Sequence, residues 1–279
     1  MLLEKLVHLD RRVIYVLILL SVVVPLWFPL ELPITPTAPT IAAFEAVEKL
    51  PEGSLILMSA DYGASTKVEI YPVVIATFYQ AMRQNKKVAF MALTPEGQSF
   101  ANQAIAAVAK AFPQKKYGED FVNLGYKAGN EAPLVSMGID FRGVFPTDVK
   151  GTPLSDIPML SRVTRLSQFD LVGTYSYGYP GALEHIRTTA TQYGRPLVVV
   201  TTAVMTPQYF PYFDSKQIVG LVGGLRGAAE YEKLTGVNSG AIKGMDAQSL
   251  AHFTIAGLIV LSNVVSLLLW WQKRKAGRS

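Results

Sequence analysis

The pattern of hydrophobic and polar positions divides the chain into two uncharged runs near its ends and a mixed segment between them. Residues 13–30 and 253–271 contain no charged side chain. Because a helix rises about 1.5 Å per residue, roughly 18–20 residues match a hydrocarbon core about 30 Å thick. We therefore predict transmembrane helices over residues 13–30 and 251–271, with a domain of residues 41–250 between them.

The middle segment alternates between short apolar runs and helix-like stretches. The apolar runs are hydrophobic at consecutive positions, which is typical of parallel strands buried on both faces. This order predicts an α/β fold with a doubly wound, Rossmann-like, mostly parallel sheet of about five strands. The expected strands are residues 54–60, 87–93, 121–125, 169–174 and 197–202, and the expected helices are residues 68–83, 96–111, 131–144 and 182–193.

Three segments lie outside this alternation. Residues 31–40 carry a proline at every third position from Pro33 to Pro39, which predicts a stiff polyproline stalk. Residues 41–50 are expected to form a short amphipathic helix. Residues 145–168 are rich in proline and are expected to leave the sheet, with a short helix at residues 157–163 that docks near the membrane or a partner.

The charge distribution predicts the direction of the two spans. The net charge is +5, and residues 1–12 and 272–279 together hold seven bases and two acids, which accounts for all of it. Bases accumulate on the cytoplasmic side of membrane spans, so both termini are expected in the cytoplasm and the domain outside it. The central segment is left neutral, which argues against a nucleic-acid partner.

A cleaved signal peptide is the alternative interpretation of residues 1–30. No A-x-A-like cleavage site follows the apolar run, which favours an uncleaved anchor. Trp27, Trp270 and Trp271 fall at the expected membrane interfaces and agree with two spans.

Polar residues follow the predicted strands. In a doubly wound sheet, ligands bind beyond the carboxyl ends of the strands, so these residues are candidates for a small polar ligand. The alternative is that they only terminate strands. The candidates are Asp61, Tyr62, Thr94, Lys127, Ser176 and Tyr177, with Tyr126, Thr201 and Thr202 beside them.

Two local motifs bear on catalysis. Thr66 and Glu69 have the spacing of a helix capping box, which gives Glu69 a structural role and leaves Asp61 as the carboxylate of most interest. Thr174–Gly178 nearly matches the nucleophile elbow G-x-S-x-G around Ser176. A serine hydrolase would also need a histidine partner, and His185 is not expected to supply one.

Other chemistry has little support in the sequence. The chain has no cysteine and three widely separated histidines, so no metal site is expected. Neither a phosphate-binding loop of the Walker type nor a dinucleotide-binding glycine motif follows the first strand, so no cofactor is expected.

Four glycines recur at helical spacing near the end of the domain. Gly220, Gly223, Gly224 and Gly227 would share one face of a helix, where each costs about 0.5–1 kcal/mol relative to alanine. Close packing must offset that cost. Packing within the domain and a helix contact between subunits both explain it, and we favour the subunit contact.

The second span carries polar residues at its middle. Asn263 needs a hydrogen-bonding partner in hydrocarbon, and Ser262 and Ser266 form a small-xxx-small pair beside it. Either Ser21 of the first span or a helix of another subunit would provide the contact.

Together these features favour a non-catalytic, membrane-anchored subunit of an oligomeric complex, in contact with lipid and with other membrane subunits. The first alternative is an extracytoplasmic ligand-binding or sensory domain that uses the strand ends. The second alternative is a hydrolase built on Ser176 or Asp61.

Overall fold

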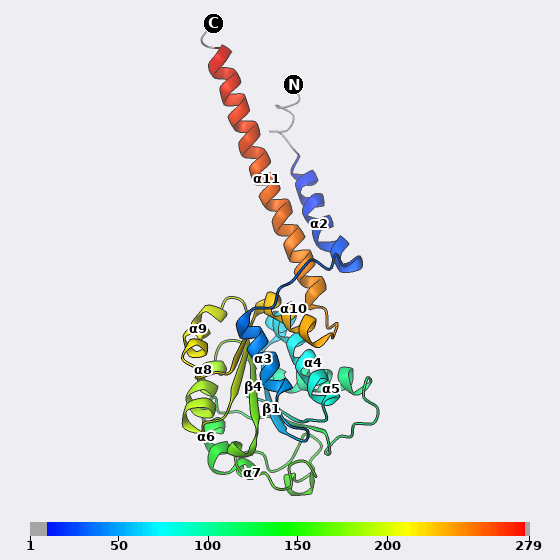
Figure 1. Ribbon diagram of the computed structural model, residues 1–279, viewed down its shortest axis with the longest axis vertical. Coiled ribbons are helices and arrows are strands. Elements are labelled where there is room, and N and C mark those ends of the chain that lie inside the picture. The colour runs from blue at the N-terminus through cyan, green and yellow to red at the C-terminus, as the bar shows by residue number, and fades with distance from the viewer. Residues whose placement is uncertain (1–9, 277–279) are drawn as a thin grey trace. The chain divides into compact units, whose positions relative to one another are not determined.

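The computed structural model describes residues 10–276, which form two compact units. The described residues up to Pro33 and those from Ile242 onward make one unit, and Ile34–Ala241 make the other. The second unit is the α/β domain, which contains the elements labelled α3 to α10 in Figure 1.

The domain is built on a six-stranded parallel sheet with the strand order β3-β2-β1-β4-β5-β6. This confirms the predicted α/β class and the parallel sheet. Strands β1, β4 and β5 are buried along their whole length and the other three at all but one position, which is why the sequence shows continuous apolar runs rather than alternation. The strands are β1 (Leu55–Asp61), β2 (Lys87–Ala92), β3 (Phe121–Tyr126), β4 (Leu171–Ser176), β5 (Leu197–Thr201) and β6 (Gly220–Gly223).

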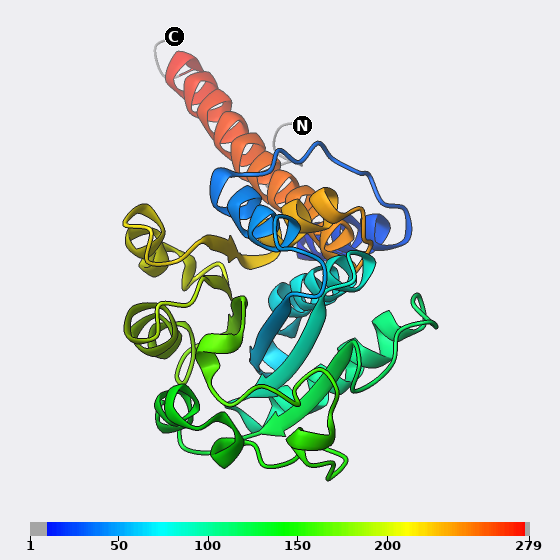
Figure 2. The same ribbon diagram turned by 60° about the horizontal axis from the view of Figure 1, so that its bottom comes forward.

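Helices cover both faces of the sheet, as Figure 2 shows. One face carries α3 (Ala38–Glu48), α4 (Lys67–Arg83), α5 (Pro95–Ala109) and α10 (Gly224–Thr235). The other face carries α6 (Ala132–Ile139), α7 (Phe141–Val144), α8 (Ala182–His185), a π-helix (Ile186–Gln192) and α9 (Thr206–Asp214). On this second face, buried sheet residues such as Leu57 and Val199 share one apolar core with helix residues such as Leu134 and Phe141.

The prediction that the four glycines lie on one helical face is wrong. Gly220 and Gly223 begin and end the sixth strand, β6, and Gly224 and Gly227 belong to α10. A short apolar run is ambiguous between strand and helix, and glycine spacing alone did not resolve it. The missed strand lies at the edge of the sheet.

The glycines of this segment permit close packing inside the domain. A Cβ atom on Gly220 would lie 2.3 Å from the Cα atom of Ala43 in α3. One on Gly223 would lie 2.2 Å from the Thr206 hydroxyl oxygen in α9. Gly224 has a φ of 63°, a left-handed conformation that favours glycine. Packing of α3 and α9 against β6 therefore explains Gly220 and Gly223 without a partner subunit.

Residues 145–168 leave the sheet as predicted, but the expected helix at residues 157–163 is absent. This part of the described chain consists of turns between two short 3-10 helices, Leu154–Asp156 and Leu166–Gln168. Met159, Leu160 and Val163 are buried in the domain's own core. Their apolar character therefore reflects packing on the sheet rather than docking to a membrane.

The capping box predicted for Thr66 and Glu69 does not form. Thr66 precedes α4 without a side-chain cap, and the Glu69 carboxylate instead accepts a hydrogen bond of 2.8 Å from the Ala203 N–H. Because Ala203 follows β5, Glu69 ties the start of α4 to the loop after another strand. A tertiary contact has replaced the local one.

The other unit contains α2 (Arg11–Trp27) and α11 (Ala241–Ala276). Among residues 10–276, α11 is the one helix long and apolar enough to cross a membrane, judged by length and composition over Ala241–Gln272. The predicted first span ends three residues early, since α2 has 17 residues and stops at Trp27. A helix of this length spans only about 26 Å, which is less than a hydrocarbon core of about 30 Å. The first span and the two-pass topology remain predictions.

Buried carboxylates hold the segment that the sequence predicted to be a stalk. The Asp246 carboxylate accepts hydrogen bonds from the N–H groups of Leu30, Glu31 and Leu32 at 2.9, 2.9 and 3.1 Å. Within the α/β domain, Glu230 accepts hydrogen bonds from the Thr37 N–H at 3.0 Å and the Thr37 hydroxyl at 2.7 Å. Helix α3 begins at Ala38, inside the predicted stalk.

Candidate functional site

The carboxyl ends of β1 and β4 meet at the point where the strand order reverses. The chain winds outward from β1 through β2 to β3, and then returns to the other side of β1 to form β4. In doubly wound sheets this switch point is the usual ligand site. Asp61 and Ser176, both predicted from the sequence, lie directly opposite each other there in neighbouring strands.

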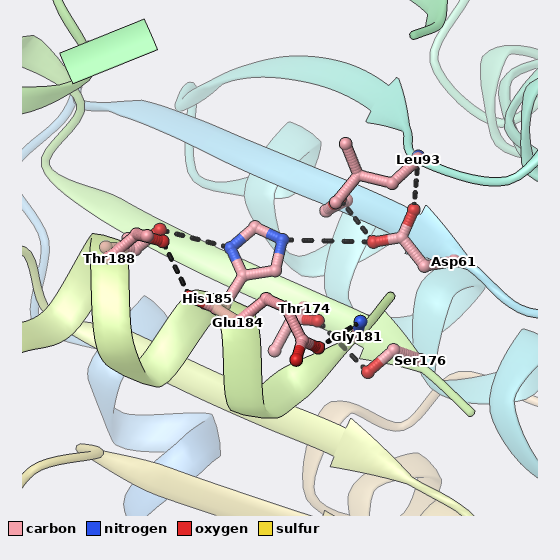
Figure 3. A network of polar contacts seen from close by, with 10 residues as sticks. Asp61, Leu93, Thr174, Ser176, Gly181, Glu184, His185 and Thr188 are labelled. Atoms are coloured by element: carbon pink, nitrogen blue, oxygen red, sulfur yellow. Dashed lines mark hydrogen bonds and ion pairs between the residues drawn. The ribbon is translucent and has the colours of Figure 1, made fainter. Parts of the chain in front are cut away.

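The Asp61 side chain is completely buried, and both of its carboxylate oxygens accept hydrogen bonds. The Ser59 hydroxyl donates to Oδ2 at 2.5 Å, and the Leu93 N–H donates to Oδ1. The Nε2 atom of His185 lies 3.8 Å from Oδ2, and a dashed line marks this pair in Figure 3. The carboxylate therefore faces the protein interior, where a substrate in solvent does not reach it.

His185 is the residue that the sequence interpretation missed. It ends α8, which follows β4, and the helix carries its fully buried ring back to the end of β1 (Figure 3). Its Nδ1 atom lies 3.1 Å from the Thr189 hydroxyl oxygen. The sequence signal that could have found it is its position in the first turn of the helix that follows β4, a strand at the switch point.

Ser176 does not form a nucleophile site with this histidine. Its hydroxyl lies 3.1 Å from that of Thr174, which donates to it, and its carbonyl accepts a hydrogen bond of 3.0 Å from Thr201. Its side chain is buried beneath Gly181, where a Cβ atom would lie 3.1 Å from the Ser176 hydroxyl oxygen. Within the described chain, no hydrogen bond joins Ser176 to His185. The arrangement lacks the nucleophile–base contact that acyl transfer requires.

The other predicted residues spread along the edge. Tyr62 is buried and stacks on Phe100 with ring centroids 5.0 Å apart, and burial raises its pKa well above the usual value. Lys127 lies two strands away from β1, with its Nζ atom 5.7 Å from the centre of the Phe145 ring. Thr94 precedes α5 without capping it. The structure therefore brings Asp61 and Ser176 together and keeps Lys127 apart.

The switch-point edge presents several large apolar and aromatic side chains to solvent. Tyr177 and Tyr179, which follow β4, are 50% and 65% exposed, and Val204, which follows β5, is 86% exposed. Val68 is 62% exposed and precedes Glu69, whose carboxylate holds the Ala203 N–H. We call the four residues Val68, Tyr177, Tyr179 and Val204 the rim.

A cavity of about 420 Å³ lies elsewhere, beside the edge strand β6. Phe210 and Leu221 form part of its wall, and Arg226 donates a hydrogen bond of 3.1 Å to Glu230 there. No residue of the switch point lines this cavity.

No metal centre is apparent in residues 10–276, since no group of three or more potential ligands gathers there. No protein-family model matches this chain, and no curated protein is recognisably similar to it.

Proposed function

We propose that this protein is a non-catalytic, membrane-anchored subunit of an oligomeric membrane complex, and that its α/β domain binds partner subunits through the rim. The proposal includes the first predicted membrane span, residues 13–30, in addition to α11, and an extracytoplasmic position of the α/β domain. Basic residues are concentrated in the two tails, which supports cytoplasmic termini and a domain outside the cytoplasm.

The contrast at the switch point carries this proposal. The groups capable of chemistry, Asp61, Ser176 and His185, are buried and directed toward one another or toward the backbone. Large apolar and aromatic side chains, those of the rim, are left in solvent at the same edge. Exposed apolar patches and tyrosine-rich surfaces are typical of protein contacts, whereas a catalytic cleft presents polar groups.

The positions of the rim residues support a continuous surface. Tyr177 and Val204 follow β4 and β5, which pair with each other. The Ala203 N–H donates a hydrogen bond of 2.8 Å to the Glu69 carboxylate, which ties the loop that carries Val204 to the start of α4, where Val68 lies. Such a surface would bury tyrosine and valine side chains at the centre of an interface.

The test is the size of the assembly after mild detergent extraction of the full chain. Wild-type protein should run as an assembly larger than one chain, and Val204→Asp should reduce that size because it places a charge in the rim. Ile139→Asp is the matched control, since Ile139 is 70% exposed at the end of α6, away from the rim. A wild-type protein that is strictly monomeric after mild extraction would refute the proposal.

A second candidate is the binding of a small polar ligand at the strand ends. The hydroxyl groups of Tyr62 and Thr202 are buried and have no hydrogen-bonding partner in the part of the chain that the structure describes. Buried hydroxyls normally find a partner, so a ligand that supplies one would favour this function. Ordered density beside Thr202 in an experimental structure of the extracted protein would distinguish it from the rim interaction.

A further inference from the structure

Asn263 is a polar amide within the apolar part of α11. The uncharged stretch of this helix ends at Gln272, and Trp270 and Trp271 lie just before that end. Counting about 20 residues of hydrocarbon back from Trp270 places Asn263 within about 4 Å of the membrane midpoint. An amide at that depth has no water to bind and requires a partner from protein.

The helices that the structure describes do not supply that partner. Within residues 10–276, the Asn263 side chain makes no hydrogen bond. Ser21, the predicted internal partner, instead donates to the Ile18 carbonyl of its own helix at 2.7 Å. Asn263 lines a groove of about 320 Å³ between α2 and α11, and the wall that α2 contributes consists of Ile14 and Ile18. These side chains carry no donor or acceptor.

We propose that the groove receives α11 of a second copy of this chain, and that the two Asn263 amides hydrogen-bond to each other across a two-fold axis. The inference rests on the proposed function as an oligomeric subunit and names the contact within the membrane. An amide carries both a donor and an acceptor, so two identical amides satisfy each other.

The membrane favours a second copy as the occupant. Two copies inserted in the same direction hold their Asn263 residues at the same depth, so a parallel pair of α11 helices aligns the amides without a shift. Ser262 lines the same groove, and Ser266 lies one turn further along. Small side chains at this spacing allow two helix backbones to approach closely.

The absence of cysteine from the sequence permits a direct test. Single cysteines are introduced into the full chain, and disulfide cross-linking is followed in intact membranes. At about 100° per residue, positions 259 and 266 lie within about 60° of Asn263. Positions 261 and 268 lie about 160° and 140° away and serve as controls. Ile259→Cys and Ser266→Cys should form cross-linked dimers, whereas Leu261→Cys and Leu268→Cys should not.

The amide is tested by adding Asn263→Val or Asn263→Gln to the Ser266→Cys chain. Asn263→Val should weaken dimerisation about threefold to thirtyfold, the range expected for one or two hydrogen bonds between membrane helices. Asn263→Gln, which keeps the amide, should restore most of it.

Three outcomes would overturn the inference: equal cross-linking on all faces, no effect of Asn263→Val, or cross-links only to a polypeptide other than a second copy. The rim variant Val204→Asp separates this result from the proposed function. If Val204→Asp abolishes partner binding while the α11 cross-links persist, the two contacts are independent. If the α11 cross-links fail while the rim contact persists, only the membrane contact is refuted.

Discussion

The structure predicts that the main role of Asp61 is to stabilise the domain, and Asp61→Ala tests this. Removing the carboxylate leaves the Leu93 N–H and the Ser59 hydroxyl without their acceptor in a fully buried position. It also leaves the His185 ring without the carboxylate 3.8 Å away. Each buried polar group deprived of its partner costs about 1–3 kcal/mol, so we expect a loss of about 3–5 kcal/mol.

The assay is thermal unfolding of the full chain in detergent, followed by circular dichroism. Tryptophan fluorescence is unsuitable, because Trp27, Trp270 and Trp271 all lie outside the α/β domain. For a domain of about 200 residues, each kcal/mol lowers Tm by about 2–4 °C, so Asp61→Ala should lower it by about 6–20 °C.

Two variants complete the comparison. Asp61→Asn retains an acceptor for the Leu93 N–H and should lose less stability than Asp61→Ala. Asp214→Ala removes an exposed carboxylate at the end of α9 and should change stability by less than about 0.5 kcal/mol. An Asp61→Ala protein with unchanged Tm that has lost ligand or partner binding would refute the reasoning, because it would give the carboxylate a functional role instead.

Two further predictions concern the edge strand and a buried tyrosine. Gly220→Ala should destabilise the α/β domain of the detergent-extracted protein by about 1–3 kcal/mol, since its Cβ atom would meet the Ala43 backbone at 2.3 Å; a defect in assembly with unchanged unfolding stability would contradict this packing role. Burial raises the pKa of Tyr209 to about 12, so its contribution to stability is complete below about pH 10 and is lost as pH rises through about 12. Tyr209→Phe should therefore reduce the alkaline decline in unfolding free energy over that window, by up to about 1.4 kcal/mol per pH unit, and an unchanged slope in a urea titration would contradict this.

The contrast between β1 and β6 shows how far the sequence could predict the fold. β1 carries seven consecutive buried residues, and such a run can be recognised without knowing its neighbours. β6 has four residues that begin and end with glycine, and its identity depends on pairing with β5 and on the close approach of α3. From the sequence alone, a glycine that lets a strand pack closely against a helix cannot be distinguished from a glycine on the face of a helix.

The candidate site shows the same limit. Asp61 and Ser176 follow predicted strands, and the rule that ligands bind beyond strand ends was enough to select them. Their burial, however, depends on Leu93 from the end of β2 and His185 from α8, and no local spacing connects those residues to Asp61. Glu69 is similar, because its hydrogen bond to Ala203 joins positions 134 residues apart and replaces the capping box that local spacing favoured.

By itself, the sequence determined the features that depend on composition along a continuous stretch. These are the parallel α/β class and an apolar helix near the C-terminus long enough to cross a membrane. A segment that is buried must be apolar whatever its neighbours are, so its pattern can be recognised in the local sequence alone. Only the tertiary structure decided that Asp61 faces inward, that β6 forms one edge of the sheet, and that tyrosine and valine side chains face solvent at the switch point. Those outcomes depend on which distant segments meet, because packing and hydrogen bonding satisfy buried groups across the fold.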